Sequence, residues 1–345
     1  NANERCTMNT LSERFFQRGS EFLGVRYPIM CGAMTWVSDP KLVAAICNTG
    51  GFGCLAGGNT PIDILREQIE ETRRLTDKPF AVNLVTIAPA YPGQLDMLCE
   101  MKVPVIIFAG SFPRGSAVEQ AKSSGSEVLA FASTLSIARR MLGYGVDGLI
   151  LEGMEAGGHV GHVSLTVLLQ QVLFEVQDVP IFAAGGIATG KMCAHLLLMG
   201  AAGVQLGTRF AMAKESCAHA NFKQAFIKAH ARDAISTPQF DSRLPVVAVR
   251  ALRNRGLDDF NRLQLDLIAK LDRGEIPRAA AQEEVEKFWM GALRCAVQDG
   301  DVDRGSLMAG QSVGLIDREE TIAEIFDDLL GGIESELGHV RESLA

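Results

Sequence analysis

The sequence predicts an α/β fold of the TIM, or (β/α)8, barrel class, with a smaller and mostly helical insertion after the eighth strand. Short runs that are apolar throughout alternate with longer amphipathic stretches, which is typical of a parallel sheet covered by helices. Eight such runs precede the break in this pattern, and eight parallel strands close a barrel. A doubly wound open sheet is the alternative if one or two of the runs are not strands.

The predicted strands lie in the first part of the chain. They are the apolar runs at 27–32, 51–57, 80–85, 103–110, 127–132, 148–153, 179–186 and 203–210. Helical patterns separate them, for example at 64–75 and 135–145. Asp39, Thr60 and Thr134 precede such patterns and suit N-caps, because a side-chain oxygen can accept a hydrogen bond from an unpaired amide of the first turn.

The alternation of strand and helix breaks near Met212. Residues 212–300 hold charge-rich helical patterns and one expected strand at 245–252, so we predict a cap domain there. The barrel would then consist of residues 20–211 and 301–335, and the chain ends in an acidic amphipathic helix.

Composition and charge indicate a cytoplasmic globular protein. The 345 residues are 47% hydrophobic and carry a net charge of −8, so a nucleic-acid partner is not expected. The eight cysteines form no CxxC pair, which favours a reducing compartment over a disulfide framework. The polar N-terminus lacks the apolar core of a signal peptide, and no apolar run approaches the roughly 18 residues of a membrane span.

Two glycine-bearing turns predict a phosphate site. Gly185 and Gly186 lie at the carboxyl end of the apolar run at 179–186, and glycine pairs at a strand end let backbone N–H groups face a ligand ahead of the next helix. Gly207 and Thr208 lie at the end of the next strand and can donate to the same phosphate, as in barrels that bind phosphate after their last two strands. The alternative is an ordinary strand-to-helix turn, with Thr208 as a helix cap and Arg209 as a surface charge.

The segment LEGMEAGGHVGH at 151–162 predicts a catalytic loop. His159 is flanked by glycines, so nothing local packs it, and it can reach a ligand and change charge near neutral pH. Glu152, at the strand end, can accept a hydrogen bond from a ring or a polyol chain. His162 is a weaker candidate for the same catalytic role.

Two further strand ends offer ligand contacts. Gly32, Ala33 and Met34 bring backbone close to a planar ligand, and Met34 or Trp36 could lie against its ring, although these residues would also serve to plug the barrel mouth. Asn83 places an amide in an apolar strand, and a buried amide without a partner costs about 1–3 kcal/mol, so a ligand partner is expected.

Other common chemistries find no support in the sequence. The six histidines include no HExxH, and no Cys/His cluster has zinc spacing, so we expect no metal site. No GxGxxG follows a first strand, which disfavours a Rossmann nicotinamide domain, and GxSxG is absent.

Six segments together resemble a known family. YPIMCGAMTWVSD, NTGGFGCLAGGNTP, EGMEAGGHVG, VPIFAAGGIATG, VQLGTRFAMAKES and GSLMAGQSVGL are similar to the FMN-dependent family of FabK-type enoyl-[acyl-carrier-protein] reductases and nitronate monooxygenases (2-nitropropane dioxygenases), over about residues 20–335. WVSD, the turn at 57–59 and the cap segments AVRALRNRGLDDF and KESCAHANFK favour the reductase branch. Cys31 departs from the usual glutamine and Ala33 from the usual glycine, which leaves a flavin or cation contact at Cys31 open.

The resemblance implies FMN at the carboxyl-terminal mouth of the barrel, with NADH or NADPH as co-substrate. Gly185, Gly186, Gly207 and Thr208 would hold the phosphate, and His159 would deliver or position a proton while flavin N5 gives hydride to an enoyl thioester. The other implied cofactor contacts are Gly32, Ala33, Met34, Asn83, Glu152, Gly158, Ala184, Gln205, Met308 and Gln311. Acyl carrier protein is an expected partner, and a homodimer is the expected assembly.

Several alternatives stay open at this point. A nitronate monooxygenase would keep the fold and FMN but oxidise an alkyl nitronate with O₂, with His159 as a base toward a nitroalkane. A flavin-dependent quinone reductase is a third possibility within the family. Outside it stand a cofactor-free barrel lyase or isomerase acting on a phosphorylated substrate, and a non-catalytic flavin-binding protein.

Overall fold

The computed structural model describes residues 10–58, 60–244, 246 and 248–345. Each of the eight predicted strands is present: β1 (Ile29–Cys31), β2 (Cys54–Ala56), β3 (Ala81–Val85), β4 (Val105–Ala109), β5 (Glu127–Ala132), β6 (Gly148–Glu152), β8 (Ile181–Ala184) and β9 (Gly203–Leu206). They form one parallel sheet in the order β1-β9-β8-β6-β5-β4-β3-β2.

The sheet closes on itself between β1 and the segment before β2. Cys31 N donates to Phe52 O at 2.9 Å, and Phe52 N donates to Ile29 O at 3.0 Å. A parallel bridge between Met30 and Phe52 marks the same contact. The predicted TIM barrel is therefore confirmed, and the open sheet is excluded.

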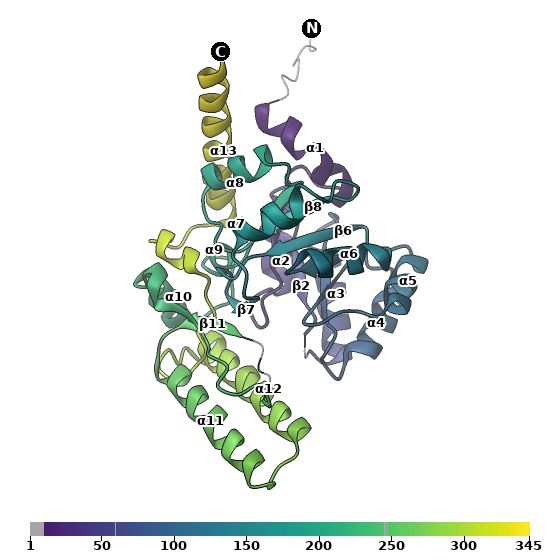
Figure 1. The fold of residues 1–345 in the computed structure, drawn as a ribbon. Coiled ribbons are helices and arrows are strands. Elements are labelled where there is room, and N and C mark those ends of the chain that lie inside the picture. Colours follow the sequence, from purple (N-terminus) through teal and green to yellow (C-terminus); the bar gives the residue numbers. More distant parts are fainter. Residues whose placement is uncertain (1–9, 59, 245, 247) are drawn as a thin grey trace.

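Helices alternate with the strands and form an outer layer (Figure 1). They are α2 (Pro40–Asn48), α3 (Ile62–Leu75), α4 (Tyr91–Glu100), α5 (Gly115–Ser123), α6 (Leu135–Gly143), α7 (Leu165–Leu168) with its continuation η1 (Leu169–Leu173), α8 (Gly190–Leu198) and α9 (Thr208–Ala211). Helices α1 (Leu11–Leu23) and α13 (Ile322–Leu344) pack beside α8, although they come from opposite ends of the chain (Figure 1).

Two of the three predicted N-caps are confirmed. The Asp39 and Thr134 side chains accept hydrogen bonds from the third residue of α2 and of α6. The prediction for Thr60 is wrong: α3 follows Pro61, and no side chain caps it. The Thr60 hydroxyl instead donates to Ala56 O at 3.3 Å.

Most residues of the strands are apolar because the strands separate two hydrophobic cores. One set of alternate side chains fills the barrel interior: Met30, Phe52, Cys54, Ala81, Val105, Ile107, Leu129, Ile150, Phe182 and Ala184. The other set, including Ile29, Val82, Ile106, Leu149 and Val204, packs outward in the larger core that the helices share. Side chains that alternate across a strand are all apolar when both faces are buried.

The buried cysteines behave as small apolar residues. Cys31, Cys47, Cys54 and Cys193 are buried, and burial raises the pKa of Cys31 and of Cys193 to about 12. All seven cysteines that the structure describes carry free thiols. Within the described residues, no helix has the length and apolar character needed to cross a membrane.

The segment after α9 adds a second, smaller core. A three-stranded antiparallel sheet is formed by β10 (Ala234–Ser236), β11 (Val249–Leu252) and β7 (Gly158–His159), in the order β10-β11-β7. Helices α11 (Arg255–Asp272) and α12 (Arg278–Arg294) extend from it as a pair (Figure 1) and bury Phe260 and Trp289, whose ring centroids lie 4.2 Å apart. Of the strand expected at 245–252, positions 245 and 247 lie outside the described residues, and the observed strand begins at Val249.

Part of the predicted cap packs on the barrel side. Helix α10 (Ala220–Ile227) buries Phe222 and Phe226 in the core shared by the barrel helices, and so do Ala296 and Val297 of the π-helical turn η3 (Cys295–Asp299). The boundaries at 212 and 300 therefore stay predictions, while the separate cap core is built from the middle of that segment.

Candidate active site

Three polar side chains form the last inward-facing layer at the carboxyl-terminal mouth. Asn83 and Glu152 each follow an inward-facing residue by two positions, and alternation along the strand therefore points them into the barrel. Gln205 and Glu152 flank Ala184, because the register pairs Glu152 with Ala184 and Ala184 with Gln205. The small Ala184 side chain leaves room between the two polar groups. Sequence analysis predicted all four residues as ligand contacts.

The environments of these polar groups differ. Asn83 Nδ2 donates to Ile107 O at 3.3 Å, so this amide has a partner within the barrel, contrary to the premise that it needed a ligand. A Cβ built on Gly32 would lie 3.4 Å from Gln205 Nε2, so glycine lets the backbone pass close over that amide. Burial raises the pKa of Glu152 to about 8, which keeps this carboxyl protonated at neutral pH.

The two glycine turns follow neighbouring strands. Gly185 and Gly186 end β8 with φ of 97° and 71°, left-handed values that favour glycine. Gly207 follows β9, which pairs with β8, and Thr208 opens α9. A Cβ on Gly185 would stand 2.9 Å from Gly153 O, so the first turn lies directly against the loop after β6.

The C-terminal segment connects the turn after β9 to the predicted catalytic loop. Gly310 N donates to Thr208 Oγ1 at 3.0 Å, and Gln311 N, at the start of the 3₁₀ turn η4 (Gln311–Leu315), donates to Glu155 O at 2.9 Å. A Cβ on Gly158 would lie 3.7 Å from Met308 Sδ. Met308 and Gln311 therefore lie at the same mouth as the β6 loop, although about 150 residues separate them in sequence.

His159 is exposed, but its loop is not unpacked as the flanking glycines suggested. Gly158 and His159 form the edge strand β7, and the register pairs His159 with Val249 of β11. The sequence did not predict this pairing, because the partner strand lies 90 positions away along the chain. His162 is also exposed, outside β7, between that strand and α7.

Residues after β1 reach the same mouth. Met34 Sδ lies 3.8 Å from the position of a Cβ on Gly207, and Ala33 packs against the barrel interior. Trp36 is 42% exposed, has a left-handed φ of 69°, and has the Arg294 guanidinium 5.8 Å from its ring centroid.

Cys31 takes no part in the mouth. Its side chain packs in the outer core, and its thiol donates to Gly32 O at 3.3 Å. The contact that the sequence left open at this position therefore has no basis in the geometry. Position 59, part of the turn at 57–59 that the sequence predicted, lies outside the described residues.

Two buried arginines support the site, and sequence reasoning underrated both. Arg209 is not a surface charge: it is 8% exposed, donates to Ala188 O, and forms an ion pair of 2.9 Å with Glu320. It thereby joins the turn after β8 to the segment before α13. Sequence analysis did not single out Arg250. The observation that could have identified it is a cationic side chain inside the apolar run PVVAVRAL.

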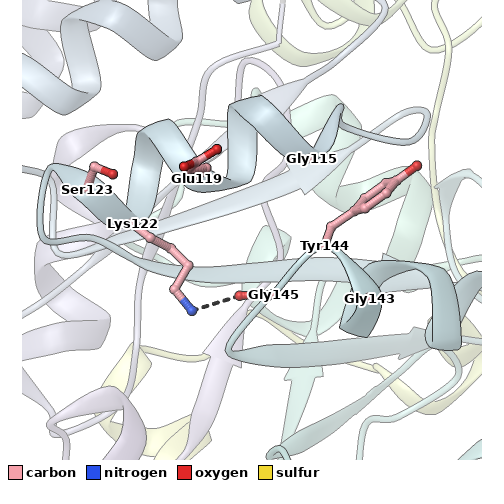
Figure 2. A pocket seen from close by; sticks show the side chains of 7 residues that line it. All are labelled: Gly115, Glu119, Lys122, Ser123, Gly143, Tyr144 and Gly145. Atoms are coloured by element: carbon pink, nitrogen blue, oxygen red, sulfur yellow. Dashed lines mark hydrogen bonds between the residues drawn. The ribbon is translucent and has the colours of Figure 1, made fainter.

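A pocket on the outer helical layer is separate from this mouth. Figure 2 shows it between α5 and the end of α6, where Lys122 Nζ donates to Gly145 O at 2.7 Å. Glu119 and Tyr144 also line it, and none of its lining residues is a predicted site residue.

Comparisons with known proteins agree with this geometry. The family model described as nitronate monooxygenase matches residues 17–92 and 85–332. A carboxyl-CoA dehydrogenase of a hydroxy-methyl-oxo-octahydroindene substrate from Rhodococcus jostii is 31% identical, over 90% of this chain and 94% of that protein. The nitronate monooxygenase of Paraburkholderia phytofirmans is 30% identical, over 86% and 93%. The solved structure of FabK from Thermotoga maritima superposes with a TM-score of 0.84 at 34% identity, covering 94% of this chain and 98% of that one.

Proposed function

This chain belongs to the nitronate monooxygenase family of oxidoreductases, and on that premise we propose that it uses FMN and NAD(P)H to reduce the C=C bond of an enoyl thioester. One observation carries the proposal: hydrogen bonds through Thr208, Gly310 and Gln311 join the turn after β9 to the loop that holds His159, and Gly185 of the turn after β8 lies against Gly153 of the same loop. A phosphate anchor and a proton-transfer group thus belong to one connected mouth.

The residues at this mouth fit FMN. Gly185, Gly186 and Gly207 present backbone without side chains at two adjacent strand ends, as a phosphate requires. Glu152 and Gln205 flank Ala184 and offer hydrogen bonds toward a ring or a ribityl chain. Bound FMN would supply hydride transfer, which no protein side chain can perform.

The protein's own part is placement and proton handling. His159 is exposed beside the mouth on β7, where its imidazole can hold the proton that the α-carbon of an enoyl thioester must receive. Protonated Glu152 can donate a hydrogen bond at neutral pH, whereas an ionised carboxylate there could only accept one.

A thioester substrate is supported by two of the comparisons. The Rhodococcus jostii relative is named as a dehydrogenase of a carboxyl-CoA compound. The Thermotoga maritima protein is named FabK, and the sequence resemblance is to FabK-type enoyl-[acyl-carrier-protein] reductases. Both substrates are acyl thioesters. The alternative is a nitronate monooxygenase, which the family model and the Paraburkholderia phytofirmans relative support. In that reaction His159 would act as a base toward the nitroalkane and NADH would not be needed.

Anaerobic stopped-flow mixing separates the two reactions. We expect NADH or NADPH to bleach the flavin absorbance and crotonyl thioester to restore it, with crotonyl-CoA and crotonyl-[acyl carrier protein] compared as carriers. If the flavin stays yellow with both nicotinamides and is bleached by an alkyl nitronate, the protein is a nitronate monooxygenase and not an enoyl reductase.

Replacing Gly185 tests the phosphate anchor. We expect Gly185→Ala to weaken FMN binding at least about 10-fold, because a Cβ there would stand 2.9 Å from Gly153 O at a φ of 97°. Titration of the FMN-free protein with FMN, followed by flavin fluorescence, measures the change.

Gly200→Ala is the matched control. Gly200 has a similar φ of 105° but open space around its Cβ, and it precedes β9 at the opposite end of the barrel. Both variants should lose about 1 kcal/mol of stability from the left-handed backbone. Equal FMN affinities in the two variants would mean that the turn after β8 does not bind the FMN phosphate.

A further inference from the structure

Arg250 lies in the middle strand of the small sheet, directly beside the candidate catalytic residue. It is 4% exposed, and the β11 register pairs it with Gly158 on one side and with Ser236 on the other. Its neighbour Val249 pairs with His159. A buried cation at this place in a sheet requires compensating partners, because an unpaired charge is costly to desolvate.

The Arg250 guanidinium donates hydrogen bonds to two other segments, the loop after β6 and the start of β10. Arg250 Nε donates to Met154 O at 2.9 Å, and Nη1 donates to Ala234 O at the start of β10. The amide of Met154 donates to Val163 O at 2.8 Å, and Val163 follows β7 in the sequence. The cap therefore holds the loop at two points: at Gly158 and His159 through the backbone ladder, and at Met154 through the Arg250 side chain.

The negative charge of Glu155 interacts with the positive charge of Arg250. Burial lowers the pKa of Arg250, and the Glu155 carboxylate opposes that shift, while the guanidinium remains charged at all ordinary pH values. The same carboxylate accepts from Leu165 N at 3.2 and 3.0 Å, at the first turn of α7. Cap strand, catalytic loop and α7 thus meet near the Arg250 guanidinium and the Glu155 carboxylate, which attract each other.

We infer that Arg250 is a positioning residue, which holds the loop of residues 153–159 in the geometry that places His159 at the mouth. The inference rests on the proposed role of His159. The loop contains Gly153, Gly157 and Gly158, so its backbone has wide conformational freedom that external contacts must restrict. Misplacing a reacting group by about 1 Å can cost on the order of 100-fold in rate.

Arg250→Met tests this inference, because methionine keeps apolar volume but removes both side-chain hydrogen bonds and the charge. We expect amide hydrogen exchange at Met154 and Val160 to accelerate about 10-fold or more, while amides in α11 keep their protection. In the loaded enzyme, flavin reduction by NADH should stay within about 3-fold of wild type, and reoxidation by the enoyl thioester should fall about 10–100-fold.

Two further variants keep the test decisive. Arg243→Met removes an exposed cap arginine that pairs with Asp241 and Asp272, and it should change neither measurement. Arg250→Lys keeps the buried charge and should recover part of the reoxidation rate; it also replaces Arg250→Met if that variant does not fold.

The hydrogen-exchange result does not depend on substrate. If NADH fails to bleach the bound flavin, the reductase assignment is wrong. The hydrogen-exchange protection of the loop can still be compared between the variants. Unchanged exchange at Met154 and Val160 in a folded Arg250 variant would overturn the inference. So would a loss of protection spread evenly over β11, α11 and α12, which would reveal a general stabilising role.

Discussion

His159→Ala is expected to lower turnover of the enoyl thioester by about 10²–10⁴-fold, the range typical of a lost general acid. The imidazole is exposed on β7, and its neighbour Gly158 lies against Met308 at the mouth. FMN affinity should change little, because the glycine turns after β8 and β9 are untouched. Rapid-reaction kinetics of flavin reoxidation, with equilibrium FMN titration beside them, measure both quantities.

His162→Ala separates the two imidazoles of this segment. Both are exposed and only three residues apart, but the ladder with β11 orients the strand at His159 and does not include His162. The large loss should therefore appear only at position 159. A comparable loss in His162→Ala with normal rates in His159→Ala would transfer the proton-handling role, and unaltered turnover in both would leave proton delivery to water.

The barrel could be predicted from sequence because its strands are buried on both faces. A strand such as β4, with Ile106 facing the helices and Ile107 facing the interior, leaves an apolar run that is hard to mistake. The glycine turns were also local signals, since a strand end followed by glycine and a helix start can be read within one segment. The positions of Gly185 and Gly207 on neighbouring strands then followed from the strand count.

The parts that sequence missed depend on contacts between distant segments. Nothing near His159 indicates that Val249 pairs with it, and a two-residue strand carries no periodicity of its own. The same reason hid the role of Arg250, whose acceptors Met154 and Ala234 come from two different segments. The miss at Thr60 is local instead: α3 begins at Ile62 with Pro61 at the N-cap position, so Thr60 stands one residue too early to cap the helix.

Glu152→Gln is expected to stabilise the FMN-free protein by up to about 3 kcal/mol at pH 7, because the native carboxyl must stay protonated where the unfolded one is ionised. Burial raises the pKa of Glu152 from 4.5 to about 8. Between these two values the native state binds one more proton than the unfolded state, so wild-type stability falls as pH rises, by about 1.4 kcal/mol per pH unit from this group alone. Glutamine has nearly the same shape and does not titrate.

Urea unfolding at a series of pH values from 4 to 9 measures this difference directly. The stability gap between Glu152→Gln and wild type should be near zero at pH 4, where the carboxyl is protonated in both states, and should widen until about pH 8, where it levels off. Glu119→Gln, on the exposed face of α5, should follow the wild-type curve. A gap that is constant across the whole range would mean that Glu152 is ionised in the folded barrel, and it would then accept hydrogen bonds at the mouth but could not donate one.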